Sequence, residues 1–218
     1  AIPEGVANFA FSRDGRWLVY RSGRAGEEQL YRLPAADPGN ARPEQITRQP
    51  AGVDAWAWAP DSRRIYFIAP DSLDTDDRLR REKGFTVSIV NQETPLASLW
   101  ALDLDPIRPV RLTDDASYTV ADFTISDDGR WVGFRAIDAD RYRRNITEQG
   151  IHADLWLIEV ATGHIERLTY NEEVPENGPA FSPDGKRIAY VTWTDADMGA
   201  VRVLDLATGN STKLTPEK

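Results

Sequence analysis

The chain has 218 residues, of which 41% are hydrophobic and 28% are charged, and 26 basic against 35 acidic residues give a net charge of −9. This composition predicts a globular chain that fits one all-β domain or two small ones. The acidic balance argues against binding to nucleic acid, and no segment is long enough to span a membrane. The absence of cysteine excludes disulfides, thiolate catalysis and cysteine-based zinc sites, but leaves the compartment undecided.

One sequence motif, which we call a phrase, occurs four times along the chain. Each copy joins two apolar runs through an Asp-Gly or similar turn, and the copies are FSRDGRWLVYRS from Phe11, WAPDSRRIYFIA from Trp58, ISDDGRWVGFRA from Ile125 and FSPDGKRIAYVT from Phe181. Aspartate bonds to its own backbone in turns, and glycine adopts the positive φ that other residues resist. Each copy therefore predicts a strand, a tight turn and a second strand.

Two further phrases follow each copy. The first alternates apolar and polar residues and predicts a third strand, in QLYRLPA from Gln29, SLWALDLD from Ser98, DLWLIEVATG from Asp154 and AVRVLDLATG from Ala200. The second predicts a short polar outer strand that ends at a threonine, in EQITR from Glu44, VRLTDD from Val110, ERLTYN from Glu166 and TKLTPE from Thr212.

The repeating unit is therefore four short antiparallel strands, which is typical of a β-propeller blade. We expect an all-β fold with four blades at about residues 1–49, 50–115, 116–170 and 171–218. The phase of the repeats favours a partial ring from a larger propeller over a closed four-bladed ring. A third possibility is that two copies associate through exposed blade faces.

Large aromatic side chains recur on the predicted middle strands. A four-stranded sheet cannot bury both of its faces alone, so we expect these residues to pack between neighbouring blades and not to form a ligand platform. They are Trp17, Trp58, Phe67, Trp100, Trp131, Phe134, Trp156, Phe181 and Tyr190.

Two connections are longer than a plain blade requires. They run from Pro70 to Ser98 and from Ile137 to Asp154, and both join the second strand of a blade to its third. A short helix is expected to begin near Asp74. Loops on a rigid scaffold often carry binding residues, so the substrate-binding candidates are the charged and aromatic residues Arg80, Arg81, Glu82, Lys83, Tyr142, Arg143, Arg144 and Glu148. The alternative is that these charges form exposed ion pairs that only hold the loops in place.

Other site patterns fail in this sequence. The acidic run at Asp74, Asp76 and Asp77 lacks the glycine and the ligand spacing of a calcium loop. His152 lies in an insert and His164 in an Ala-Thr-Gly-His turn, and no G-x-S-x-G segment is present. We therefore expect no catalytic residues, no metal and no cofactor in these 218 residues.

The repeats resemble the Asp-Gly propeller repeat shared by TolB-type proteins and by the N-terminal domain of prolyl oligopeptidase family serine peptidases. The inserts favour the peptidases. DSLDTDDRLRREKGFTV, NQETPLASLWALDL and TISDDGRWVGFRAIDADRYRRNITEQGIHADLWLIEVATG are similar to the propellers of bacterial dipeptidyl peptidases and acylaminoacyl peptidases. The resemblance covers essentially the whole chain.

The resemblance implies a non-catalytic propeller that gates access of small peptides to an α/β-hydrolase domain and helps to position them. The expected partners are then the hydrolase domain of the parent chain and a peptide substrate, and this chain alone is expected to be inactive. A bacterial periplasmic or secreted location is favoured over a cytoplasmic one. The alternative function is a free-standing, protein-binding propeller of the TolB kind.

Overall fold

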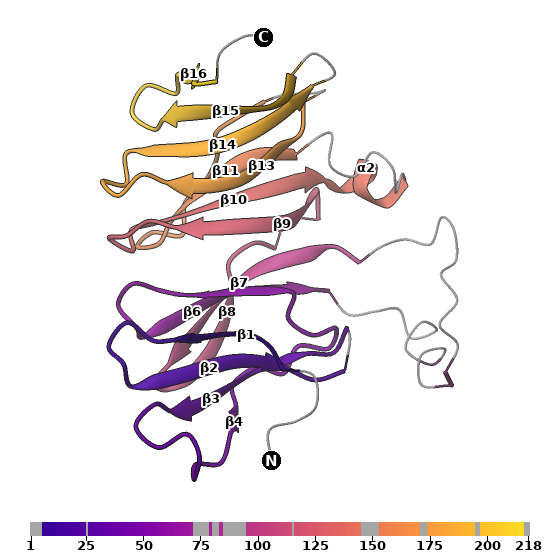
Figure 1. Ribbon diagram of the computed structural model, residues 1–218. Helices are drawn as coiled ribbons and strands as arrows, with labels where there is room; N and C mark the ends of the chain where they lie inside the picture. The colour runs from indigo at the N-terminus through magenta and orange to yellow at the C-terminus, as the bar shows by residue number, and fades with distance from the viewer. Residues whose placement is uncertain are drawn as a thin grey trace. The chain divides into compact units, whose positions relative to one another are not determined.

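Four antiparallel sheets of four strands each make up the fold (Figure 1). The computed structural model describes residues 6–24, 26–71, 79, 83–84, 95–114, 116–144, 153–170, 174–194 and 197–215. In every sheet the strands are neighbours in chain order, so each sheet is an up-and-down meander. The four four-stranded units predicted from the repeats are therefore confirmed, and the fold is a β-propeller fold.

The strands lie where the three repeated phrases predict them. The first sheet contains β1 (Ala7–Phe11), β2 (Trp17–Ser22), β3 (Gln29–Pro34) and β4 (Glu44–Gln45). The second contains β5 (Ala55–Trp58), β6 (Arg64–Pro70), β7 (Ala97–Leu104) and β8 (Ile107–Arg111). The third contains β9 (Tyr118–Ile125), β10 (Trp131–Asp138), β11 (Ala153–Glu159) and β12 (Ile165–Arg167). The fourth contains β13 (Glu176–Phe181), β14 (Arg187–Thr194), β15 (Asp197–Asp205) and β16 (Ser211–Lys213).

The turn between the first two strands is built by hydrogen bonds within the repeated phrase. In the first blade the Ser12 hydroxyl donates to Asp14 Oδ1 at 2.6 Å and accepts the N–H of Trp17 at 3.0 Å. Asp14 also accepts the N–H of Arg16, and Gly15 adopts a φ of 71°. The Ser12 and Arg16 hydrogen bonds lower the pKa of Asp14 to about 2. The third and fourth blades repeat the arrangement at Ser126 and Ser182.

In the second blade two residues of this turn are different. Ala59 replaces the turn serine, and Ser62 replaces the glycine with a φ of 60°. A left-handed conformation costs a serine about 1 kcal/mol or more. The Ser62 hydroxyl accepts the N–H of Asp14 at 3.1 Å, which links the turns of the first two blades and offsets that cost.

The threonine that ends each outer strand does more than mark a turn. In the first three blades its hydroxyl accepts a backbone N–H from the third strand of the same blade, so it extends the pairing where the outer strand stops, whereas the Thr215 hydroxyl of the fourth blade has no such partner among the described residues. The donor and acceptor pairs are Leu30 with Thr47 at 2.8 Å, Leu99 with Thr113 at 2.9 Å and Leu155 with Thr169 at 2.9 Å.

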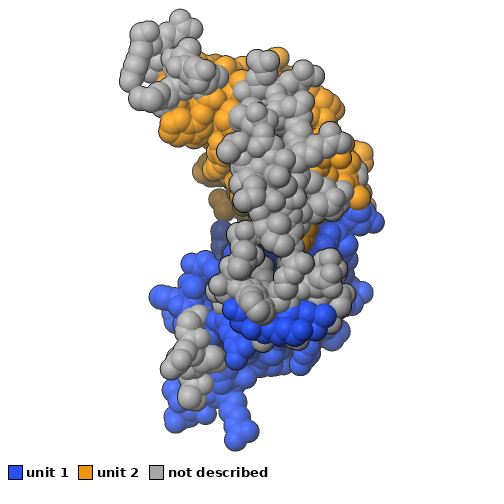
Figure 2. All heavy atoms as spheres, turned by 90° about the vertical axis from the view of Figure 1, so that its right-hand side faces the viewer, with its two compact units in different colours: residues 1–90, 97–114 blue, residues 91–96, 115–218 orange. Residues whose placement is uncertain are grey.

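The chain forms two compact units, each of which holds two blades (Figure 2). Unit 1 comprises Ala1–Val90 and Ala97–Asp114, and unit 2 comprises Asn91–Leu96 and Asp115–Lys218. The core of unit 1 joins its two sheets through buried residues that include Val19, Leu30, Ile65, Phe67 and Leu102. The core of unit 2 joins its sheets through Leu155, Leu157, Ile188, Tyr190 and Leu204.

The aromatic residues predicted to pack between blades divide into two groups. Phe67, Phe134 and Tyr190 are buried. The other six, Trp17, Trp58, Trp100, Trp131, Trp156 and Phe181, are half-buried. Trp58 and Trp100 pack against the core of unit 1, and Trp131 and Phe181 pack against the core of unit 2. The prediction of interblade packing is confirmed for Phe67, Trp58, Trp100, Trp131, Phe181 and Tyr190, and it stays a prediction for Trp17, Phe134 and Trp156.

Large apolar side chains are exposed in the first and the last sheet. Phe9 and Phe11 on β1 are 72% and 59% exposed, and Trp193 on β14 is 50% exposed. Self-association through such faces remains a prediction. A search of the described residues finds no helix long and apolar enough to cross a membrane.

Candidate functional site

The strands of each sheet turn at two opposite ends, and "edge" here means one of these ends and not an outermost strand. At one edge, which we call the turn edge, the Asp-Gly turn joins the first strand to the second. At the opposite edge, which we call the insert edge, the second strand connects to the third, as the terminal pairs Ser22 with Gln29, Pro70 with Ala97 and Ile137 with Ala153 show. Both long inserts therefore leave their sheets at the insert edge.

The first insert is described only in part. Lys83 lies in a turn, and its N–H donates to the carbonyl of helical Leu79 at 3.1 Å, which is the spacing of one helical turn. The other predicted residues of this insert, Arg80, Arg81 and Glu82, lie outside the described residues, as does the predicted helix start near Asp74. Their role in substrate binding stays a prediction.

The second insert begins with a short helix, α2 (Ala139–Arg144). Asp138 precedes it and accepts the N–H of Asp140 at 2.9 Å, which is the bond of a helix N-cap. Buried Ala139 anchors the helix, because its N–H donates to the carbonyl of Ser117. The helix backbone includes the predicted site residues Tyr142, Arg143 and Arg144, and Tyr142 is half-buried. Glu148 lies outside the described residues.

Arginines on the outer strands reach the insert edge of both long-insert blades. Arg111 in β8 forms an ion pair with Asp71 at 3.0 Å and donates to Ser98 Oγ at 2.6 Å. Arg167 in β12 occupies the equivalent position and pairs with Asp154. Neither residue was a site candidate from the sequence, although both belong to a repeated Arg-Leu-Thr motif, in VRLTDD and ERLTYN, that could have indicated them.

Two buried carboxyl groups lie on either side of the Thr169 hydroxyl at the insert edge of unit 2. Asp154 is 5% exposed and Glu176, the first residue of β13, is 4% exposed. The Thr169 hydroxyl accepts the Leu155 N–H and lies 2.5 Å from Glu176 Oε2 and 3.5 Å from Asp154 Oδ1. One hydroxyl proton satisfies only one of these carboxylates, so the favoured bond is the short one to Glu176.

Burial governs the protonation of Glu176. It raises the pKa of Glu176 to about 7, although the hydrogen bond from Thr169 opposes the rise. Asp154 has the Arg167 guanidinium beside it, whereas Glu176 has no ion-pair partner in the described part of the chain. The insert edge thus holds a carboxyl group that gains or loses its proton near neutral pH. No motif of the sequence singles out Glu176 as a site residue.

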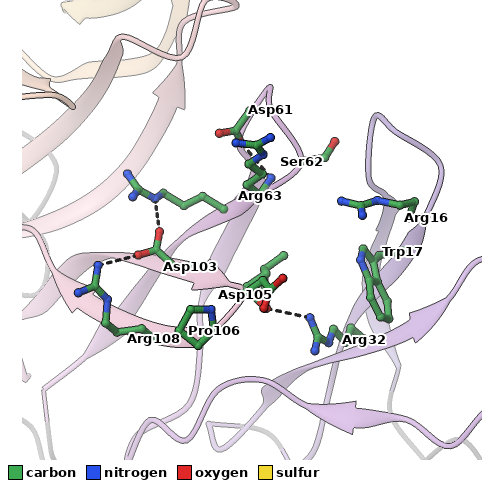
Figure 3. A pocket seen from close by; sticks show the side chains of 12 residues that line it. Arg16, Trp17, Arg32, Asp61, Ser62, Arg63, Asp103, Asp105, Pro106 and Arg108 are labelled. Carbon is green, nitrogen blue, oxygen red and sulfur yellow. Dashed lines mark hydrogen bonds and ion pairs between the residues drawn. The ribbon is translucent and has the colours of Figure 1, made fainter.

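A separate pocket of about 1000 Å³ lies at the turn edge of unit 1, between its two blades (Figure 3). Its lining residues are Arg16, Trp17, Arg32, Asp61, Ser62, Arg63, Arg64, Asp103, Leu104, Asp105, Pro106 and Arg108. None of these residues was a site candidate from the sequence, because they come from five strands and their turns and meet only in the folded unit.

The described residues contain no group of three or more histidine, cysteine, aspartate or glutamate side chains that could hold a metal ion. His164 lies in an exposed turn, where its N–H donates to the Thr162 hydroxyl at 3.2 Å. His152 lies outside the described residues.

No protein-family model matches the chain. Among curated proteins it is 25% identical over its whole length to the Tol-Pal system protein TolB of Hahella chejuensis, of which it covers 49%. It is 24% identical to the uncharacterized peptidase YuxL of Bacillus subtilis and 23% identical to dipeptidyl-peptidase 5 of Porphyromonas endodontalis. These matches use 83% of the chain and cover 20% and 28% of the two peptidases. The chain thus spans half or less of each relative.

Solved structures show the same architecture. A putative TolB from Agrobacterium tumefaciens aligns with 99% of the chain at a TM-score of 0.62 and 21% identity, with 67% of that protein covered. A puromycin-hydrolyzing peptidase from Mycobacterium tuberculosis aligns with 100% of the chain at a TM-score of 0.67 and 13% identity, with 29% of that protein covered. Together with the repeats and sheets, these comparisons show that the chain has a β-propeller fold and that its sequence is similar to TolB and to bacterial peptidases.

Proposed function

We propose that this chain is the non-catalytic propeller portion of a serine peptidase, which gates access of small peptides and helps to position them for a hydrolase domain. The observation that carries the proposal is the equivalent placement of both long inserts, each between the second and third strands of its blade. A scaffold whose two long inserts both leave at the insert edge of their blades is suited to presenting binding loops there. The peptidase relatives support the same assignment.

The chemistry of the inserts suits peptide termini. An arginine guanidinium binds a carboxylate or a carbonyl oxygen through its planar fork, and a glutamate binds a protonated amine. We assign the first role to Arg80, Arg81, Lys83, Arg143 and Arg144 and the second to Glu82 and Glu148, with Tyr142 as an aromatic contact. The ion pairs of Arg111 and Arg167 would fix the strands from which these loops project.

The double substitution Arg143→Gln and Arg144→Gln tests the positioning role in the natural protein that contains this chain. Steady-state hydrolysis of small peptide substrates is expected to show a KM raised about tenfold with kcat changed less than about twofold, because uniform binding is lost while the reacting groups are untouched. Arg130→Gln, at the turn edge of the same blade, is the matched control and should leave KM unchanged. An unchanged KM in the double variant would refute the assignment of these two residues.

A second function is favoured by the match to TolB over the full length of the chain. Under that alternative the propeller is free-standing and binds another protein. The two hypotheses differ in the natural gene, which continues into a G-x-S-x-G segment only under the peptidase hypothesis.

A further inference from the structure

We propose that the turn-edge pocket of unit 1 is a binding site for a small oxyanion that carries two or more carboxylate or phosphate groups. The site lies between the first two blades, at the edge opposite to the inserts, and is independent of the peptide-positioning function. Five arginines and three aspartates line the pocket in a chain whose net charge is −9. The lining residues therefore carry two more basic than acidic side chains, and the acids Asp14 and Glu44, which pair with Arg16 and Arg32, lie outside the lining.

Arg32 forms a fixed anchor on the floor of the pocket. Its side chain is 14% exposed, its guanidinium lies 4.5 Å from the ring centre of Trp17, and its Nε pairs with Glu44 at 2.6 Å. Its Nη1 donates to the carbonyl of Leu104 at 3.1 Å. Nη2 forms no hydrogen bond within the described ranges, so one donor of an immobilised guanidinium remains for a ligand. A donor that is already ordered loses little conformational freedom on binding.

Exposed arginines line the pocket above this anchor. Arg16 extends from the first blade toward the second, and its Nε pairs with Asp14 at 2.6 Å (Figure 3). Arg63 extends from the second blade and forms no side-chain ion pair with any described residue. Arg16 and Arg63 keep amino groups that can bind an oxyanion in the bidentate manner typical of guanidinium groups.

Two of the three aspartates of the pocket are already engaged, so these two repel an anion less than their number suggests. Asp103 accepts from Arg64 at 2.7 Å and from Arg108 at 3.1 Å. Asp61 accepts the N–H of Arg63 at 2.9 Å. The cations that remain available, Arg16, Arg32 and Arg63, lie on both sides of the cavity, which favours a ligand with two anionic groups over a single monovalent ion.

Isothermal titration of the 218-residue chain with citrate and, separately, with pyrophosphate tests the site. At about 20 mM salt we expect a dissociation constant below about 1 mM for at least one of them, weakened at about 200 mM salt because the site is ionic. Binding of citrate alone would assign carboxylate ligands, and binding of pyrophosphate alone would assign phosphate ligands.

Matched substitutions distinguish the pocket from general charge effects. Arg16→Gln and Arg63→Gln change exposed side chains and are each expected to weaken binding about tenfold, which is the loss of one charge-assisted hydrogen bond. Arg48→Gln removes the same charge from unit 1 outside the pocket and should leave the affinity within about twofold. The proposal is overturned if neither anion binds in the millimolar range, or if Arg48→Gln weakens binding as much as the pocket substitutions do.

Discussion

Phe67→Ala is expected to lower the free energy of unfolding of unit 1 by about 3 to 5 kcal/mol, the largest effect of any change considered for this chain. Phe67 lies in the middle of β6, is 0% exposed and belongs to the core that joins the first two blades. Its ring stacks on Trp100 with 6.0 Å between centroids. Truncation would leave a cavity at the seam between two sheets, neither of which buries that face alone. Urea denaturation, monitored by tryptophan fluorescence, measures the loss in the free energy of unfolding.

Phe11→Ala is the matched control for this experiment. Phe11 lies on β1 of the same unit, but its side chain is 59% exposed. Its removal should change the free energy of unfolding by no more than about 0.5 kcal/mol, as for most surface substitutions. Equal losses for the two variants would contradict the account, because they would mean that the outer face of the first blade is as much a core as the seam between the blades.

Glu176→Gln is expected to stabilise the protein increasingly as the pH rises from 5 to 8. Burial raises the pKa of Glu176 to about 7 in the folded state, from a reference value of 4.5. Below the reference value both states hold the proton, so the group does not affect folding. Between the two values the folded state binds the proton more tightly, and the native stability falls as the pH rises. The full loss, on the order of 3 kcal/mol, is reached above pH 7.

The glutamine variant lacks this titration but keeps an oxygen that accepts the Thr169 hydroxyl. Its stability relative to the parent chain should therefore rise by about 2 to 3 kcal/mol between pH 5 and pH 8, measured by urea denaturation at several pH values. Glu166→Gln, at an exposed position on neighbouring β12, should show no such trend. A difference between Glu176→Gln and the parent that does not change with pH would show that Glu176 is ionised in the folded state throughout this range.

The repeats made the fold predictable to the level of individual strands. The turn phrase repeats the same hydrogen bonds at Ser12, Ser126 and Ser182, so local chemistry is enough to locate two strands of each blade. What could not be predicted is the role of residues that break the repeat. Ser62 in place of glycine is understood only when its bond to the neighbouring turn at Asp14 is seen.

The site was less predictable than the fold, for a physical reason. The insert residues were found because they interrupt a period, and α2 now gives Arg143 and Arg144 a helical backbone beside β10. Glu176 and Asp154 were missed because they are separated in sequence and lie within ordinary strand phrases. Their proximity depends on the packing of the third blade against the fourth, and the acidity of Glu176 depends on burial that no local pattern reports.

Reaction of the natural protein with a fluorophosphonate probe, which labels activated serine nucleophiles, tests the central proposal most directly. If this propeller belongs to a serine peptidase, the labelled species will contain these 218 residues in a longer chain, and peptide sequencing will place the modified serine outside them and within a G-x-S-x-G segment. A natural protein that contains this chain, is folded and remains unlabelled would contradict the peptidase assignment and favour a free-standing binding propeller.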